Sequence, residues 1–545
     1  MKRVWDPERS VSRMSFEDRV RQLFMLGFDG KRIEEGLKDL LEELRPGGII
    51  IFSRNVESRD QLRELLSQAN GISFKLTGTP LLISIDQEGG IVARIRKGFA
   101  VFPGNMALGA TYSPENAYSV GKAVGEQLKW FGINVNLAPV LDIILDKTNP
   151  SIGVRSFGDD PIHVSKMGGA MIAGLRESGI IAVAKHFPGI GAASIDPHID
   201  LPVLDIPLDV LRKREFVPFA EAIKEGVEAI MPSHVVVPEI DPDMPATLSK
   251  KLIEGTLRGE LGFHGAILSD DLLMGAVSRR YSLVEASLLA LKAGEDMALI
   301  CRDFEEQMDA IDFVIKAAER GDLPKERVAA SLCRVMNLKK KVSGMLGKKP
   351  NFERLFHLER RVCEESVTLV KLREGCLPLL NGSLSKILVV CPQRIKKLVE
   401  TGVSSSTLGE KIRSKGFNVA EIFFEEEDAV EAIEESIKHV LWADYIVICT
   451  REVLRFNKEA ELVRELNRVA CENDKCLIIA SLGTPYDILA FPEVENYLAV
   501  YDYHEPMQDA LVSVLLGKLK PKGRLPVSID GMFHRGHGIS PEVYG

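Results

Sequence analysis

The chain has 545 residues, of which 45% are hydrophobic and 27% are charged, with a formal net charge of −9 and a pI of about 5.8. This length favours two or three domains, and the composition is typical of a soluble globular protein. The acidic balance argues against nucleic acid or an anionic membrane as a partner, because both attract clustered basic charge.

Short apolar runs alternate with longer amphipathic stretches in the first part of the chain. Residues 47–52 (GGIIIF) are predicted to form a buried strand, and residues 58–71 a helix that ends at Gly71. Further strands are predicted to reach Asp86, Asp142, Phe187, Val237, Asp270 and Ile300. Apolar strands separated by helices indicate a parallel sheet covered on both faces. Seven or eight such units in roughly 340 residues favour a (β/α)8 barrel over an open sheet.

A basic segment that contains Gly and Pro, residues 339–352, interrupts this pattern. We predict a barrel domain over residues 1–345, a linker over 346–360 and a C-terminal domain over 361–545. The last part again alternates apolar runs with helical stretches; the runs are KILVVCP, NVAEIFF, ADYIVICT, KCLIIASLG and ENYLAVYDY. The predicted fold class is therefore α/β, with an N-terminal TIM barrel followed by an α/β sandwich that has an open, mostly parallel sheet.

The termini and cysteines bear on location. The N-terminus lacks the apolar segment of a signal peptide, and no run of about 18 apolar residues could span a membrane. The eight cysteines are scattered, without a Cys-x-x-Cys pair, and several lie in apolar runs such as ILVVCP. Buried, reduced thiols are expected from this pattern. Together these features predict a cytoplasmic protein.

Polar side chains gather where the predicted strands end. They are Asp86, Asp142, Lys185 with His186, His234, and Asp270. In a barrel, the C-terminal ends of the strands share one mouth, and active sites lie there. We therefore expect these residues, which are far apart in the sequence, to meet in one small volume.

Carboxylates stand at three of these strand ends, at Asp86, Asp142 and Asp270. Asp270 and Asp271 are adjacent, so one faces the mouth and the other turns away; an inward Asp270 would act as a nucleophile or electrostatic stabiliser. A pair of ordinary turn acids is the alternative. Asp86 precedes Gly89 and Gly90, which allow the backbone to approach a ligand, although an ordinary turn has the same composition. No metal is expected, because no His or further acid stands at ligand spacing.

Basic groups offer further chemistry. Asp196 and His198 stand two residues apart in a loop of small residues, where a carboxylate orients an imidazole and the loop can close over a ligand. Alone, such a pair usually has no function. Lys185 suits either the Schiff-base amine of a barrel aldolase or a donor to sugar hydroxyls. Arg155, in RSFGDDP, suits hydroxyls or carboxylates.

Six blocks in order carry a resemblance to a known family: DQEGG, NLAPVLD, RSFGDDP, KHFPG followed by Asp-x-His, IMPSHVVVP with PATLS, and SDDLLMGA. With them the chain resembles the glycoside hydrolase family 3 β-N-acetylglucosaminidases, and its tail resembles the second domain of the two-domain members. The resemblance implies a retaining, exo-acting enzyme without a cofactor. Its substrates would be carbohydrates. The enzyme would release N-acetylglucosamine (GlcNAc) from peptidoglycan fragments or chitooligosaccharides, in cell wall recycling or chitin degradation.

The resemblance also implies roles for individual residues. Asp270 would be the nucleophile, His198 the acid/base and Asp196 its orienting partner. The implied sugar contacts are Asp86, Arg94, Arg155, Lys185, His186, His234 and Met274. The sequence departs from the family pattern at Ile91 and Ile190, which replace an arginine and a histidine, and at Pro197 inside the Asp-x-His block. These departures bear on substrate preference.

Four alternatives stay open. Another family member, such as a β-glucosidase, fits most of the blocks, although the Asp-x-His is associated with N-acetyl sugars. A phosphorylase is possible because a histidine acid/base, unlike a carboxylate, does not repel phosphate. Outside this class are a Schiff-base lyase or aldolase that uses Lys185 and a non-catalytic sugar-binding protein. The sequence does not fix the oligomeric state.

Overall fold

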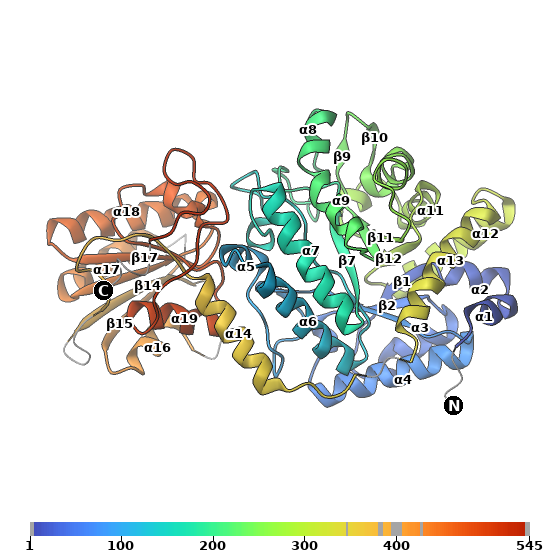
Figure 1. Ribbon diagram of the computed structural model, residues 1–545, viewed down its shortest axis with the longest axis horizontal. Coiled ribbons are helices and arrows are strands. Elements are labelled where there is room, and N and C mark those ends of the chain that lie inside the picture. Colours follow the sequence, from blue (N-terminus) through green and yellow to red (C-terminus); the bar gives the residue numbers. More distant parts are fainter. Residues whose placement is uncertain (1–4, 345–346, 380–384, 394–405, 426–428, 540–545) are drawn as a thin grey trace.

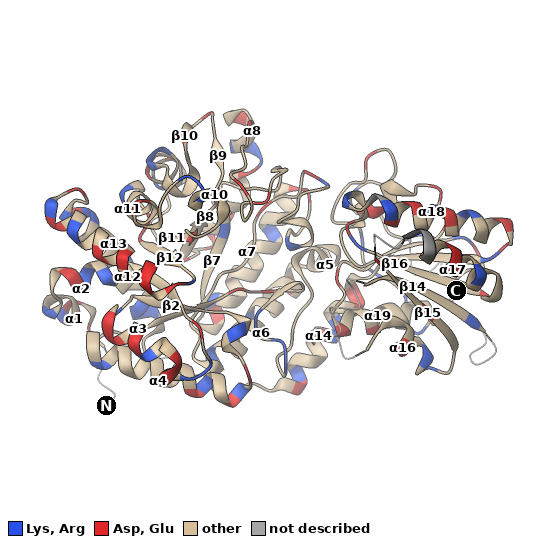
Figure 2. Ribbon diagram, turned by 180° about the vertical axis from the view of Figure 1, so that it is seen from behind, with Lys and Arg blue, Asp and Glu red and all other residues tan. Residues whose placement is uncertain are grey.

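Eight short apolar strands of the N-terminal part close into a parallel barrel, and a second α/β unit lies beside it (Figure 1). The computed structural model describes residues 5–344, 347–379, 385–393, 406–425 and 429–539. The predicted fold class is confirmed for both units. Figure 2 shows basic and acidic residues intermixed over the outer helices. The barrel strands are almost free of charged residues.

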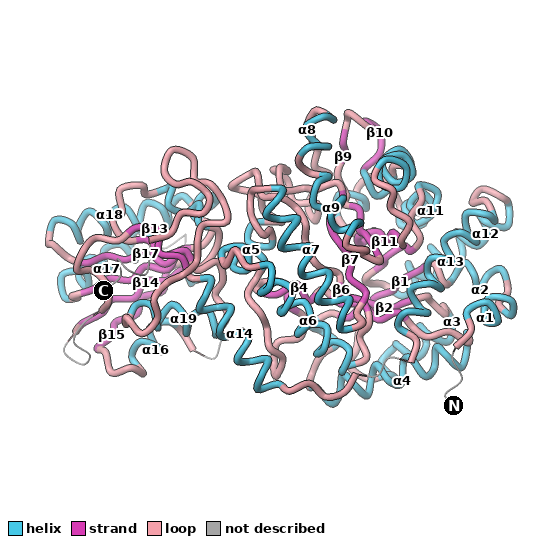
Figure 3. Tube along the Cα trace, in the orientation of Figure 1, coloured by secondary structure: helices cyan, strands magenta, loops and turns pink. Residues whose placement is uncertain are grey.

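The barrel strands are ordered β1-β12-β11-β8-β7-β6-β3-β2. Their bounds are β1 Phe24–Gly27, β2 Gly48–Ile51, β3 Leu82–Ile85, β6 Val135–Asn136, β7 Ile181–Phe187, β8 Ala229–Pro232, β11 Ala266–Asp271 and β12 Met297–Ile300. All neighbouring pairs are parallel. Figure 3 shows these strands enclosed by helices, which explains why they read as continuous apolar runs.

Two of the predicted strands are shorter than expected. The run that reaches Asp142 pairs only over β6, with one further bridge between Val140 and Lys185. The run that reaches Val237 divides after β8, and Val236–Val237 (β9) pairs instead with Asp241–Pro245 (β10) outside the barrel. A short β4–β5 ribbon, Gln87–Gly89 and Val92–Ala93, lies just beyond β3. β1 was not predicted.

Helices cover the outside of the barrel. They are α1 Pro7–Arg13, α2 Phe16–Arg21, α3 Lys38–Glu43, α4 Arg59–Thr77, α5 Asn105–Ala110, α6 Pro114–Phe131, α7 Pro161–Ser178, α8 Leu208–Lys213, α9 Phe216–Lys224, α10 Gly275–Ser278, α11 Leu283–Ala293, α12 Phe304–Arg320 and α13 Lys325–Val342, with a π-helical segment at Lys251–Glu260. Gly71 does not end α4, so that prediction is wrong. The helix continues to Gly78, whose φ of 69° provides the left-handed C-cap.

The second unit is a six-stranded sheet in the order β13-β18-β17-β16-β14-β15. The strands are β13 Thr368–Lys371, β14 Lys386–Pro392, β15 Asn418–Phe424, β16 Tyr445–Thr450, β17 Cys476–Ser481 and β18 Tyr497–Ala499. Only β13 is antiparallel to its neighbour. α17 (Ala429–Trp442) and α18 (Asn457–Glu472) pack together on one side, and α16 (Leu408–Arg413) and α19 (Glu505–Leu515) on the other (Figure 1).

The two units are joined at more than one place. α14 (Phe352–Ser366) starts within the segment predicted as a linker and packs against α5 and α6 of the barrel as well as α19. The chain also returns to the barrel near its end, where Arg524 N donates to Ala110 O at 2.9 Å and Arg535 pairs with Asp159 at 2.7 Å. None of the helices in the described part of the chain is long and apolar enough to cross a membrane.

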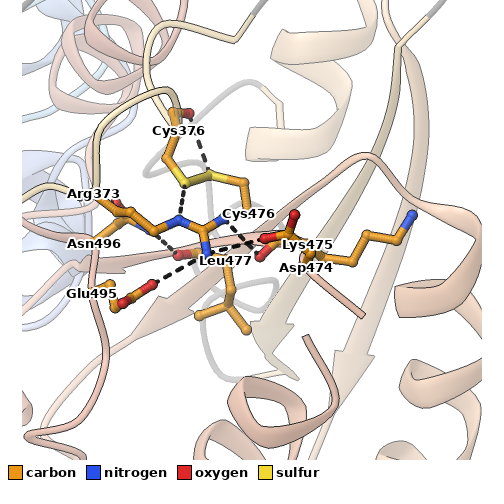
Figure 4. Close-up of a disulfide and its surroundings, with 8 residues drawn as sticks. All are labelled: Arg373, Cys376, Asp474, Lys475, Cys476, Leu477, Glu495 and Asn496. Atoms are coloured by element: carbon orange, nitrogen blue, oxygen red, sulfur yellow. Dashed lines mark hydrogen bonds and ion pairs between the residues drawn. A yellow bond between two sulfur atoms is a disulfide. The ribbon is translucent and has the colours of Figure 1, made fainter. Parts of the chain in front are cut away.

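Two cysteines form a disulfide, so the expectation of reduced thiols is wrong for this pair. Cys376 lies in the loop after β13 and Cys476 begins β17, with their Cα atoms 5.5 Å apart. Figure 4 shows the bond beside Arg373, whose Nε lies 3.4 Å from Cys376 Sγ. The two positions are 100 residues apart, so the sequence did not reveal that the fold brings them together. The free cysteines are Cys301, Cys333, Cys363, Cys391, Cys449 and Cys471.

Candidate active site

The predicted convergence of polar residues occurs at the C-terminal ends of the barrel strands. Asp86 follows β3, Lys185 and His186 lie near the end of β7, and Asp270 lies near the end of β11. β3 and β11 are on opposite sides of the barrel. The mouth is therefore lined by charged groups, with the strand end that carries Asp86 opposite the one that carries Asp270.

Lys185 is the centre of a buried ion network. Its Nζ lies 2.7 Å from Asp86 Oδ1 and 2.7 Å from Glu88 Oε1. Burial by itself would lower the pKa of Lys185, but the two carboxylates raise it above its ordinary value, so the group is an ammonium ion. A Schiff-base lysine needs a depressed pKa to be a free amine. The aldolase alternative therefore finds no support in this geometry.

Glu88 is a site residue that the sequence analysis did not select. It accepts hydrogen bonds from Arg155 Nε at 2.9 Å and Nη2 at 2.8 Å, in addition to the Lys185 ammonium. Burial opposes ionisation, but Arg155 and Lys185 hold the pKa of Glu88 far below its ordinary value. The signal that could have revealed it was its position two residues after Asp86, which in an extended chain returns the side chain to the same face.

Asp86 and Arg94 complete the network. Arg94 Nη2 lies 3.3 Å from Asp86 Oδ2, and its backbone N–H donates to Gln87 Oε1 at 2.9 Å. Although burial raises it, the pKa of Asp86 stays lowered because of the nearby Lys185 and Arg94. Asp86 is thus an ionised acceptor, suited to sugar hydroxyls.

His186 is held by Asp142, which the sequence placed at a strand end without a role. Asp142 Oδ2 lies 2.7 Å from His186 Nδ1, and its Oδ1 accepts from the backbone N–H of Ile190 at 2.7 Å. The other ring nitrogen, Nε2, points toward Arg155 Nη2 at 3.5 Å. The carboxylate thereby fixes the ring orientation. Ile190 is buried, so its apolar side chain contributes packing where a histidine would contribute a polar group.

Asp270 and Asp271 have different surroundings, as predicted. Burial by itself would raise the pKa of Asp270, but His234, His186 and Lys185 hold it below its ordinary value, so the carboxylate is ionised. Asp271 accepts instead from the backbone N–H groups of Leu273 and Cys301, both at 3.2 Å, and burial raises its pKa.

His234 and Met274 support this strand end. Both His234 nitrogens are engaged by the protein, Nδ1 with Thr247 Oγ1 at 2.7 Å and Nε2 with Asp271 O at 2.9 Å. Burial lowers the pKa of His234. Met274 N donates to Asp271 O at 3.0 Å, and its side chain is almost fully buried. His234 therefore offers no free nitrogen to a sugar and acts on the backbone that carries Asp270.

The Asp196–His198 pair lies in a loop at the rim of the mouth. Asp196 Oδ1 lies 2.8 Å from His198 Nδ1, and this hydrogen bond raises the pKa of the imidazole. The His198 side chain is 66% exposed, so its Nε2 is free to meet a ligand. The loop is docked on the turn after Asp271, where Ala276 N donates to Pro197 O at 3.0 Å. Pro197 O therefore anchors the loop between Asp196 and His198.

The glycines after Asp86 serve a different purpose from the predicted approach of a ligand. Gly89 and Gly90 have φ values of 110° and 53°. A Cβ on Gly90 would lie 2.8 Å from the backbone of Gly104 and 3.0 Å from Asp502 Oδ2. Asp502 belongs to the C-terminal unit, so the glycines allow that unit to pack directly behind the Asp86–Glu88 segment. Ile91 is half-buried beside this contact.

No group of three or more His, Cys, Asp or Glu side chains in the described ranges has metal-binding geometry. The ammonium and guanidinium groups of Lys185 and Arg155 already neutralise the clustered carboxylates. The site is therefore an arrangement of ionised hydrogen-bonding groups, with one buried carboxylate and one exposed imidazole that can act on a bound ligand.

The sequence of this chain is similar to those of known proteins. The Glycosyl hydrolase family 3 N terminal domain matches residues 15–338, which contain all ten site residues predicted from the sequence. Beta-hexosaminidase A of Pseudoalteromonas piscicida is 30% identical over 549 positions, covering 91% of each chain. A Beta-hexosaminidase of Idiomarina loihiensis is 36% identical over 302 positions, covering 54% of this chain and 88% of that protein.

The likeness extends to solved structures. A glycoside hydrolase family 3 beta-N-acetylglucosaminidase from Paenibacillus sp. str. FPU-7 has a TM-score of 0.86 and 33% sequence identity. The match covers 95% of this chain and 99% of that one, and so includes both units.

Proposed function

The chain belongs to glycosyl hydrolase family 3, and from this premise we propose that it is a retaining, exo-acting β-N-acetylglucosaminidase. It is a glycoside hydrolase, and the β-hexosaminidase A that matches 91% of its length supports β-N-acetylhexosaminidase activity. One observation carries the finer proposal. The Asp196–His198 pair is docked on the turn that follows the Asp270 strand end, which puts a proton donor beside an ionised carboxylate.

The sugar lies between the two sides of the mouth. Asp86 accepts hydrogen bonds from its hydroxyls, and Lys185, Arg155, Arg94 and His186 donate to them. Met274 lines the same end of the barrel, and His234 holds the backbone beside Asp270. Because Glu88 neutralises Lys185 and Arg155 from behind, these donors are fixed before the sugar arrives.

In the first step, Asp270 attacks the anomeric carbon and forms the glycosyl-enzyme bond. The bond to the leaving oxygen breaks, and His198 Nε2–H gives its proton to that oxygen. The hydrogen bond with Asp196 raises the pKa of His198, which favours the protonated form that donates. Such a proton transfer contributes about 10²–10⁴-fold to the rate.

In the second step, the neutral His198 removes a proton from water, and the hydroxide oxygen attacks the same carbon. The bond to Asp270 breaks, and the carboxylate is restored. Two inversions at one carbon retain the β configuration. The proposed substrates are peptidoglycan fragments or chitooligosaccharides with a terminal GlcNAc, in cell wall recycling or chitin degradation.

We also propose the division into a barrel domain (1–345), a linker (346–360) and a C-terminal domain (361–545), and α14 occupies the linker from Phe352 onward. The cytoplasmic location stays a prediction.

The experiment that tests the mechanism is trapping. A slowly hydrolysed β-N-acetylglucosaminide should leave one sugar mass on the peptide that contains Asp270, detected by mass spectrometry. Proton NMR during hydrolysis of a good substrate should show the β anomer first. Immediate appearance of the α anomer would exclude the mechanism, and a label on another residue would exclude Asp270 as the nucleophile.

Two arms of the same assay separate the alternatives. A panel of chromogenic glycosides distinguishes a hexosaminidase, which prefers the N-acetyl sugar, from a β-glucosidase. Adding inorganic phosphate distinguishes the acceptor, because a phosphorylase releases GlcNAc 1-phosphate in place of GlcNAc.

A further inference from the structure

The loop that carries the proton donor also exposes aliphatic side chains. Ile195 is 44% exposed, Ile199 60% and Val203 56%. These are three of the eight most exposed large apolar side chains in the part of the chain that the structure describes. Single exposed aliphatic residues are ordinary on protein surfaces, but a group of them within nine residues is not.

The local backbone places two of these side chains around His198. Ile199 N and Asp200 N both donate to Asp196 O, at 2.8 Å and 3.1 Å, so residues 196–200 form one helical turn. Ile199 lies in this turn and Ile195 directly precedes it, so the two isoleucines flank the Asp196–His198 pair along the chain. Neither packs into the hydrophobic core of either unit.

The loop is held in place from below. Asp200 pairs with Arg280 Nη1 at 2.7 Å, and Pro197 O accepts from Ala276 N at 3.0 Å. These contacts fix the turn without covering Ile195 or Ile199. The exposed isoleucines are therefore a stable feature of the rim.

The proposed role of His198 as proton donor indicates which part of the substrate lies beside these isoleucines. A general acid must come within about 2.6–3.2 Å of the oxygen that it protonates. The leaving group is bonded to that oxygen, so it lies beside His198 and the residues that flank it. By the proposed function Asp86, Lys185 and Arg155 contact the sugar that is cleaved off, and Asp86 follows β3, on the side of the barrel opposite Asp270.

We propose that Ile195 and Ile199 form the leaving-group subsite and that the enzyme favours β-N-acetylglucosaminides whose leaving group presents an apolar surface. This inference rests on the proposed function, since it takes His198 as the proton donor. Val203 extends the same surface along the loop. A leaving group covered by hydroxyls on both faces gains less from these side chains, because its polar groups lose water without finding partners.

The test is a series of n-alkyl β-N-acetylglucosaminides from butyl to octyl. The acidity of the leaving alcohol is nearly constant along this series, so differences in kcat/KM report contact and not chemistry. We expect kcat/KM to rise about twofold for each added methylene, as half-burial of that group would give. The octyl to butyl ratio, over four added methylenes, is then about 16-fold.

Variants locate the effect. The double variant Ile195→Ser/Ile199→Ser should bring the octyl to butyl ratio close to one. Ile199→Thr keeps the β-branched shape and should give an intermediate ratio. Leu441→Ser is the matched control, because Leu441 is 54% exposed but lies on α17 of the other unit, and it should keep the wild-type ratio.

The outcomes are separable. No rise along the series, or a rise that persists in the double variant, would overturn the leaving-group subsite. A wild-type enzyme that cleaves no β-N-acetylglucosaminide, including the activated 4-nitrophenyl glycoside, would overturn the proposed function instead.

Discussion

Glu88 and Arg155 form a two-point ion pair beneath the sugar-binding side chains. Their side chains are only 3% and 14% exposed, and Glu88 Oε1 also contacts Lys185 at 2.7 Å. The Glu88 carboxylate thus holds two cations, Lys185 and Arg155, that we propose bind the substrate. This makes Glu88 a positioning residue.

The first prediction concerns this pair. Glu88→Gln should destabilise the protein by about 3–5 kcal/mol, because it leaves buried cations without a full counter-charge. It should also raise KM for a GlcNAc glycoside, since Lys185 and Arg155 lose their fixed orientation. Denaturant unfolding and steady-state kinetics measure the two effects.

The control for Glu88 is another buried acid with cationic partners. Asp296 pairs with Arg258, Arg327 and Arg334 just before β12, at the end of the barrel away from the mouth. Asp296→Asn should lower stability but leave KM unchanged. Equal KM values for Glu88→Gln and wild type would contradict the positioning role.

The second prediction separates the adjacent acids. Asp270→Asn should lower kcat by at least about 10³-fold, because the glycosyl-enzyme cannot form. Asp271→Asn removes an acceptor for two backbone N–H groups, so its main effect should be on stability. Kinetics at matched folded fractions compare them, and similar kcat losses for both variants would argue against Asp270 as the nucleophile.

The third prediction is a pH dependence. His198 must be protonated to donate, and its pKa is raised by Asp196. Removing the carboxylate with Asp196→Asn lowers that pKa, so the alkaline limb of kcat/KM should move to lower pH. Asp200→Asn is the control on the same loop, because Asp200 pairs with Arg280 and not with His198.

The leaving group provides a second readout for His198. His198→Ala should slow hydrolysis of alkyl glycosides by about 10²–10⁴-fold. The loss should be much smaller for a 4-nitrophenyl glycoside, whose leaving group needs little protonation. Equal losses on both substrates would contradict a proton-donor role.

The fourth prediction concerns a lysine outside the site. Lys339 of α13 is fully buried, its Nζ bonds to Gln22 and Thr79, and burial lowers its pKa to about 7. In the unfolded chain the pKa is about 10.4. Between these values the unfolded chain binds the extra proton, so the free energy of unfolding should rise with pH, by up to about 1.4 kcal/mol per pH unit.

Replacing this lysine tests the linkage. Lys339→Met should flatten the rise in stability between about pH 7 and pH 10. Lys340→Met changes the exposed neighbouring residue and should leave the slope unchanged. Unfolding curves at several pH values supply the comparison, and an unaltered slope in Lys339→Met would show that Lys339 is not the source.

The sequence predicted where the polar side chains gather because barrel strands end in polar residues. Where a buried apolar run stops at Asp86, Lys185 or Asp270, the polar residue marks the end of the strand. The barrel mouth brings these strand ends together. Glu88 was missed because it lies past the strand end, in the short β4 ribbon. β1 was missed although it has four residues, as do β2 and β12, which were predicted.

Other features depend on tertiary contacts that no local pattern shows. Gly71 costs α4 about 1 kcal/mol in propensity, yet the helix continues beyond it, where Ile72 packs against the core and Ser73 is buried. The Cys376–Cys476 disulfide links positions 100 residues apart. The packing of Asp502 behind Gly90 depends on the docking of one unit on the other.

Near its end the chain returns to the barrel, and this gives the two units a second attachment, which is entirely non-covalent. Tyr112 donates to Leu525 O at 2.8 Å, and Asp159 accepts from Ser528 N and pairs with Arg535, both at 2.7 Å. A cut between α13 and α14 would therefore open the polypeptide without releasing either half. The two pieces would stay together as one complex, and Asp502 would keep its packing against Gly90 after the cut.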